Sequence, residues 1–314
     1  MAKLDAANAA FAGFSLISRR PLAVVGWAVF IFVVGVLPAF GLLSAMGSSL
    51  AELIRLGESG ADPTPEQIMP MMSTIYAMNP ILWVTSLVMR VVLAGAIFRA
   101  VLEPSQGRWA YLRLGMGELM IAVVTIVLSI MLGVGASVWV LLTVGVCLAL
   151  WEASQPAAIG AGVVSGVALL VTMIWLLLRF SLAAPMSFAE KNFRLIESWK
   201  LTRGHAGGLL LMALILFVIM IIVEAVLMAL FAGALAATGA GLVTAGGLDE
   251  AAIHAFFSQP PSVWMSALMP WIVVACIVGS LVGAAVSAIV TAPWAEAYRQ
   301  LRGGGETQPE VLAA

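Results

Sequence analysis

Two charged side chains lie inside apolar runs and are the first residues whose types could do chemistry. Arg90 falls within the second apolar run and Glu224 within the fifth. A charge at the centre of a bilayer costs about 2.5–3.5 kcal/mol on insertion scales, so such residues usually face a partner or a cavity. At 1.5 Å per residue, Arg90 lies roughly 15 Å and Glu224 roughly 20 Å from the outer ends of their runs. We therefore expect either a polar point in a substrate or ion path, or an ion pair that fixes helix register.

Residue types that bind metals are present, but their spacing favours packing. Thioether sulfur can bind Cu(I), and four methionines lie before the second run: Met69, Met71, Met72 and Met78. The spacing of Ile68, Met72 and Ile75 is that of an apolar helix face, which is the simpler interpretation. His205 and His254 fall on opposite sides of the membrane in the topology below, so they cannot share an ion. We expect no metal site and no cofactor.

Motifs of the common enzyme classes do not occur in the sequence. There is no Asp dyad, Ser/His pair, HExxH helix or P-loop sequence. Cys147 and Cys276 lie in apolar runs, where a small buried hydrophobe is the usual role of cysteine. The net charge of −1 argues against binding nucleic acid, which needs clustered Lys and Arg. We expect a protein that is not an enzyme and does not bind nucleic acid.

The composition identifies the class of protein. Of 314 residues, 62% are hydrophobic and 10% are charged, whereas roughly a quarter of residues are charged in soluble domains. A membrane span needs about 20 apolar residues, and six runs meet this length: 22–46, 80–103, 117–150, 157–188, 206–237 and 265–295. We predict an all-α integral membrane protein with six transmembrane helices, with a single membrane domain over residues 1–303 and a disordered tail over 304–314.

Positive charge alternates from one connection to the next. Bases precede the first span, lie at or between the second and third and the fourth and fifth spans, and follow the sixth: Lys3, Arg19, Arg20, Arg99, Arg108, Arg113, Arg179, Lys191, Arg194, Lys200, Arg203, Arg299 and Arg302. The other connections contain Arg55 among several acids. Because basic loops stay in the cytoplasm, we expect both termini and the even-numbered loops to be cytoplasmic.

Three span entries resemble one another. FSLISRRPLAVV precedes the first span, WAYLRLGMGELM the third and WKLTRGHAGGLL the fifth. Each combines a short amphipathic stretch with an arginine, namely Arg20, Arg113 or Arg203, and with Gly or Pro where the span begins. One interpretation is three repeats of an interfacial helix plus a helical hairpin. The other is that any cytoplasmic span entry collects aromatic residues and arginine.

The outer connections contain helix-start signals. Thr64, Pro65 and Glu66 have the residue types of an N-cap, a first-turn proline and a first-turn acid. They predict a periplasmic helix that begins there, ahead of the second span. We also expect a short helix at 49–57 and an amphipathic helix that starts after Asp249.

The polar segment between the fourth and fifth spans runs from Arg179 to Gly204. In its second half the apolar residues alternate with bases: Phe193, Leu195, Ile196, Trp199 and Leu201 with Lys191, Arg194, Lys200 and Arg203. This pattern predicts an interfacial helix whose cations face anionic headgroups, with Trp199 at headgroup depth. Glu190 would favour its N-terminus and Gly204 would end it.

The same segment resembles a known family. The residues that carry the resemblance are Arg179, Pro185, Glu190 and the run Ser198-Trp199-Lys200-Leu201-Thr202-Arg203-Gly204, with Pro293 and Tyr298-Arg299-Gln300-Leu301-Arg302 near the C-terminus. These residues are similar to the signature of bacterial six-span membrane proteins related to the membrane domain of glycerophosphoryl diester phosphodiesterases. In the phosphodiesterases a separate soluble domain performs the hydrolysis. Since this chain has no room for that domain, the resemblance implies the membrane module without the enzyme.

Two functions follow as hypotheses. The first is a non-enzymatic protein of a bacterial inner membrane with a scaffold, assembly or lipid-handling role, because basic interfacial helices suit anionic lipid, a protein partner or a second copy. The alternative is a small-solute or ion transporter or channel with a mid-membrane polar site at Arg90 and Glu224.

Overall fold

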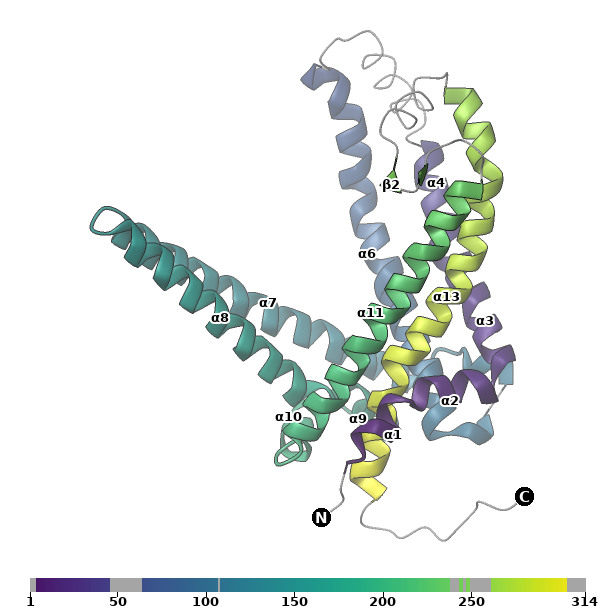
Figure 1. Ribbon diagram of the computed structural model, residues 1–314. Coiled ribbons are helices and arrows are strands. Elements are labelled where there is room, and N and C mark those ends of the chain that lie inside the picture. Colours follow the sequence, from purple (N-terminus) through teal and green to yellow (C-terminus); the bar gives the residue numbers. More distant parts are fainter. Residues whose placement is uncertain are drawn as a thin grey trace. The chain divides into compact units, whose positions relative to one another are not determined.

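The computed structural model (Figure 1) describes residues 4–45, 64–106, 108–237, 243–244, 247–248 and 261–303. The helices expected at 49–57 and after Asp249, His254, and the tail at 304–314 lie outside these residues. The chain divides into two compact units. The first comprises Met1–Arg19, Val91–Leu214 and Ala288–Ala314, and the second comprises Arg20–Arg90 and Ile215–Ser287.

Within the described ranges, six helical segments are long and apolar enough to cross a membrane: Pro21–Gly41, Met72–Leu102, Met116–Trp151, Gln155–Glu190, Ala206–Leu230 and Met269–Gly303. Each overlaps one of the six runs found in the sequence. The prediction of an all-α membrane protein with six spans is therefore confirmed.

The first span is built from three consecutive helical segments. These are α3 (Pro21–Ile31), the π-helical segment η1 (Phe32–Val36) and α4 (Leu37–Ala45). The break coincides with Pro38, whose ring clashes with the carbonyl of Val34 in a regular α-helix. A widened π turn relieves that clash while the chain stays helical.

The second span belongs to a helix longer than predicted. α6 (Pro65–Leu102) begins at Pro65 with Glu66 in its first turn, so the helix start predicted there is confirmed. The prediction of a separate helix ahead of the span is wrong, because α6 continues without interruption through Pro80. A proline inside a helix removes its own backbone hydrogen bond, and a membrane helix tolerates that loss.

The remaining elements are mostly short helices and long spans. In chain order they are α1 (Ala6–Ala10), α2 (Ala12–Arg19), the 3-10 segments η2 (Pro104–Gln106) and η3 (Arg108–Tyr111), α7 (Met116–Trp151), α8 (Gln155–Phe180), α9 (Ala183–Glu190), α10 (Leu195–Leu201), α11 (Ala206–Ala237), the antiparallel pair β1 (Val243–Thr244) and β2 (Gly247–Leu248), and α13 (Pro261–Gly303). Short α-helices thus precede the first and fifth spans, but 3-10 segments precede the third. Only two of the three expected repeats therefore have a short α-helix ahead of the hairpin, and the interfacial position of these helices stays a prediction.

The N-terminal helices of the first unit pack on the end of α13. A Cβ placed on Gly13 of α2 would lie 2.4 Å from the Cα of Ile289, so the two backbones touch where only glycine fits. The backbone N–H of Asp5 donates to Oε1 of Gln300 at 2.9 Å. These contacts fix the start of the chain against its last helix.

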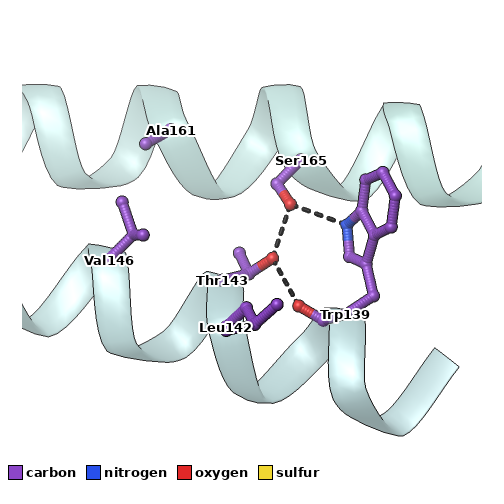
Figure 2. Close-up of a pocket in the computed structure, with 6 residues that line it drawn as sticks. All are labelled: Trp139, Leu142, Thr143, Val146, Ala161 and Ser165. Carbon is purple, nitrogen blue, oxygen red and sulfur yellow. Dashed lines mark hydrogen bonds between the residues drawn. The ribbon is translucent and has the colours of Figure 1, made fainter. Parts of the chain in front are cut away.

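α7 and α8 lie side by side as a hairpin (Figure 1). Ser154 caps α8 by accepting from the N–H of Ala157 at 3.4 Å. Further along the pair, Nε1 of Trp139 donates to Oγ of Ser165 at 2.9 Å, and the hydroxyls of Thr143 and Ser165 lie 2.5 Å apart (Figure 2). The hydroxyls and the indole therefore satisfy one another across the helix pair, which holds the two helices in register.

A groove of about 290 Å³ lies beside this hydrogen-bonded set (Figure 2). The residues that line it are Trp139, Leu142, Thr143, Val146, Ala161 and Ser165. Its polar groups already bond to one another, and Thr143 also donates to the carbonyl of Trp139 at 2.9 Å. The groove offers an apolar lining and no free reactive group.

Candidate functional site

The polar segment after the fourth span folds as two short helices separated by a sharp turn. α8 ends at Phe180 and α9 starts at Ala183, with the buried Pro185 in the first turn, where a backbone N–H has no helical acceptor in any case. α9 ends at Lys191, whose φ of 52° is left-handed. The N–H of Arg194 then donates to Oγ of Ser187 at 3.0 Å. This turn sets the direction of α10.

α10 is fixed by hydroxyl groups on its inner face. Oγ of Ser198 and Oγ1 of Thr202 both donate to the carbonyl oxygen of Arg179, at 3.1 Å and 3.2 Å. Both side chains are fully buried. The carbonyl lies in the last turn of α8, where no helical N–H is available to it. α10 therefore caps the C-terminal end of α8.

The side chain of Arg179 lies against two tryptophan rings that contact each other. Its Cζ is 5.5 Å from the ring centroid of Trp175 and 5.6 Å from that of Trp199. The rings meet edge to face at 5.0 Å, and Phe180 lies 5.3 Å from Trp199. Nε and Nη1 of Arg179 are buried, and no described residue accepts a hydrogen bond from them. We call Trp175, Arg179 and Trp199 the Arg179 box.

Glu190 links this segment to the end of the last helix. Its Oε2 lies 2.9 Å from Nε of Arg194, and its Oε1 accepts from the hydroxyl of Tyr298 at 3.4 Å. Nη1 of Arg302 lies 3.6 Å from the same Oε1 and donates to the Tyr298 hydroxyl at 2.6 Å. We call Glu190, Arg194, Tyr298 and Arg302 the Glu190 cluster. It joins the two stretches that carry the family resemblance.

Charge pairing continues from the Glu190 cluster onto α10. Nη1 of Arg194 donates to Oε1 of Glu197 at 2.9 Å. This bond, followed by the charge of Glu190, raises the pKa of Arg194. The pKa of Glu197 is lowered, first by a hydrogen bond from its own backbone N–H and then by the bond from Arg194. Both acids of the segment are therefore paired with Arg194.

A buried ion pair that the sequence analysis did not single out lies nearby in the first unit. Nη2 of Arg99 bonds to Oε1 of Glu118, and Nη1 bonds to the carbonyl of Tyr111. Arg99 is 3% exposed and Glu118 is 2% exposed. The Arg99 guanidinium also lies 5.5 Å from the ring centroid of Phe188 on α9. This pair ties the end of α6, the start of α7 and α9 together.

The sequence held a signal for this pair. Arg99 contributes to the positive charge between the second and third spans, and Glu118 is an acid at the start of the third span, close to the bases Arg108 and Arg113. Gly95 confirms the close approach, because a Cβ there would lie 2.6 Å from Oε1 of Glu118. An acid and a base at neighbouring span ends, with glycine on the same helix face, is the pattern to look for.

The other predicted residues have no such contacts. Arg90 and Glu224 are both exposed, and no ion pair joins them in the described part of the chain. Their pairing and their role in a path stay predictions. Arg203 and Gly204 are exposed after α10, and Gly204 has a φ of 89°. Gly204 thus lies in the turn before α11, as its residue type suggests.

The described residues contain no group of three or more His, Cys, Asp or Glu side chains that could hold a metal ion. Comparisons with protein-family models, curated proteins and solved structures found no match. The family resemblance therefore stays an expectation from the sequence. What the geometry offers is a network of charges and aromatic rings at the ends of spans.

Proposed function

We propose that this chain is a non-enzymatic, multi-pass protein of a bacterial inner membrane, with both termini in the cytoplasm and a lipid-handling role. In this proposal the polar segment between α8 and α11 lies at the cytoplasmic membrane surface and binds anionic lipid. A scaffold or assembly role with a protein partner or a second copy is compatible with the same surface. The alternation of basic loops supports the orientation.

The observation that carries the proposal is the two-sided character of α10. Its inner face is the pair of buried hydroxyls on Ser198 and Thr202. Its outer face presents Ile196, which is 69% exposed, next to the exposed base Lys200. Phe193, just before the helix, is also exposed. Apolar side chains exposed together with cations are typical of a helix in the headgroup region of an anionic membrane.

The test compares two lipids that differ in net charge. The purified protein in a non-ionic detergent is heated with phosphatidylglycerol or with phosphatidylcholine of the same acyl chains, and the unfolding midpoint is recorded. We expect a larger upward shift with phosphatidylglycerol, because only the lipid that binds the folded state stabilises it. The preference should shrink in the double variant Lys200→Gln, Arg203→Gln and in high salt. Equal shifts with both lipids would contradict the proposal.

A further inference from the structure

We infer that the Arg179 box is a binding site for the phosphate group of a membrane lipid, with the guanidinium of Arg179 as the phosphate ligand. This inference rests on the proposed lipid-handling function and assigns it to one residue. Lys191, Lys200 and Arg203 are exposed and Arg194 is paired with acids, whereas Arg179 lies against two rings and has no acid partner among the described residues.

The first argument is the unsatisfied hydrogen-bonding capacity of Arg179. A guanidinium has five N–H donors and no acceptor. Nε and Nη1 are buried without a protein acceptor, which costs roughly 1–3 kcal/mol for each such group. The two acids of the segment are engaged elsewhere, since Glu190 and Glu197 pair with Arg194. The described residues therefore supply no acceptor that neutralises Arg179, and an anion from outside the chain would do so at the remaining nitrogen, Nη2.

The second argument is the direction left open for a ligand. Trp175 and Trp199 both lie within cation–π distance of the guanidinium, and because their ring centroids are only 5.0 Å apart they cover one side of it. Nη2 is neither enclosed nor bonded within the described structure. Nη2 carries two N–H donors, and charge-assisted hydrogen bonds from arginine to phosphate oxygens are stronger than bonds between neutral groups.

The third argument is depth. Arg179 lies in the last turn of α8, within about 11 residues of the end of the fourth apolar segment at Glu190, and tryptophan side chains such as Trp175 and Trp199 are enriched at the level of the headgroups. A helix C-terminus alone disfavours an anion. Here, however, the carbonyl of Arg179 already accepts from Ser198 and Thr202, which reduces the negative potential at this end. The chemistry therefore fits a phosphate at headgroup depth.

Native mass spectrometry of the detergent-purified chain tests the site. Phosphatidylglycerol, phosphatidylcholine and diacylglycerol with matched acyl chains are titrated in turn, and inorganic phosphate is added as a competitor. We expect the wild type to bind one phospholipid much more tightly than diacylglycerol. Arg179→Gln should weaken phospholipid binding at least tenfold, and Arg179→Lys should give an intermediate loss, because lysine keeps the charge but not the planar guanidinium that lies against the two rings. The control Arg113→Gln removes an exposed charge elsewhere in the same unit and should bind as the wild type does.

Each outcome separates the site from the wider proposal. Undiminished phospholipid binding in a folded Arg179→Gln variant would overturn the site and leave the lipid-handling function standing. Binding of phosphatidylglycerol and phosphatidylcholine alike, lost with Arg179, would support the phosphate site but contradict a preference for anionic lipid. Displacement of lipid by millimolar inorganic phosphate would support the site and identify free phosphate as its ligand. If Arg179→Gln does not fold, the wild-type comparison decides: equal affinity for phospholipid and diacylglycerol would overturn the site.

Discussion

The buried pair of Arg99 and Glu118 offers a quantitative test of what holds the first unit together. The substitution Glu118→Leu keeps a side chain of similar size but removes the carboxylate that Arg99 bonds. Among the described residues, Arg99 would then be a buried charge whose remaining hydrogen-bond acceptor is the carbonyl of Tyr111. Removing one partner of a buried ion pair costs about 3–5 kcal/mol. The single variant should therefore lose a large part of the free energy of unfolding of a typical domain, which is about 5–15 kcal/mol.

The partner substitution Arg99→Met should cost a similar amount, because it leaves Glu118 charged and buried. Its Oε2 already has no hydrogen-bond donor in the described structure, so no other group can replace Arg99. The double variant Arg99→Met, Glu118→Leu contains neither charge. Since replacing a whole buried pair by apolar residues is often neutral, its loss should be at least about 2 kcal/mol smaller than the sum of the single losses.

The assay is unfolding by sodium dodecyl sulfate in mixed micelles, followed by far-ultraviolet circular dichroism. The three variants and the wild type form a double-mutant cycle. The pair of Arg194 and Glu197, in which both side chains are more than a third exposed, is the control, because solvent-exposed ion pairs couple by only about 0.2–1 kcal/mol. Losses that add within about 0.5 kcal/mol at Arg99 and Glu118 would refute the reasoning.

Two other predictions concern packing and titration. Gly117→Ala should lower the thermal midpoint by overpacking, at about 1–3 kcal/mol, because its Cβ would lie 2.7 Å from the ring of Phe188; Gly133→Ala has open space and should be neutral or stabilising. If Gly117→Ala melts with the wild type, that contact is not tight. By NMR, the carboxyl of Glu197 should titrate below 4.5, and Arg194→Gln should raise its pKa. Because the pKa of Glu197 is lower in the folded state, its carboxylate stabilises the fold above the unfolded-state pKa. This stabilisation is lost as pH falls through the folded-state pKa. An unchanged pKa of Glu197 in the Arg194→Gln variant would contradict the pairing.

The spans could be predicted from sequence because one physical requirement sets them. A stretch that crosses hydrocarbon must be apolar over a fixed length, and this pattern is local. The start of α6 at Pro65 was predictable for the same reason, since capping depends on neighbouring residue types. The end of the helix that begins at Pro65 could not be predicted, because Pro80 was compatible with either a helix boundary or a continuous span.

The contacts of the site depend on residues far apart in the chain. Glu190 was expected to favour the start of the interfacial helix, but it ends α9 and contacts Tyr298 and Arg302. The resemblance placed these residues in two motifs without indicating that they touch. Arg179 was recognised as a motif residue, whereas its contact with Trp199 required the turn at Lys191. Long-range pairing of this kind leaves no periodic signal in one sequence.

The hairpin of α7 and α8 is longer than a bilayer is thick. No charged residue lies between Glu118 and Glu152, a distance of about 50 Å along the helix axis, against a hydrocarbon thickness of about 30 Å. An apolar helix pair of this length must tilt or thicken the lipid around it. Trp139 and Ser165 keep the two helices together during such a tilt. The hairpin therefore couples this protein to membrane thickness, so that thin and thick bilayers impose different inclinations on the same rigid pair.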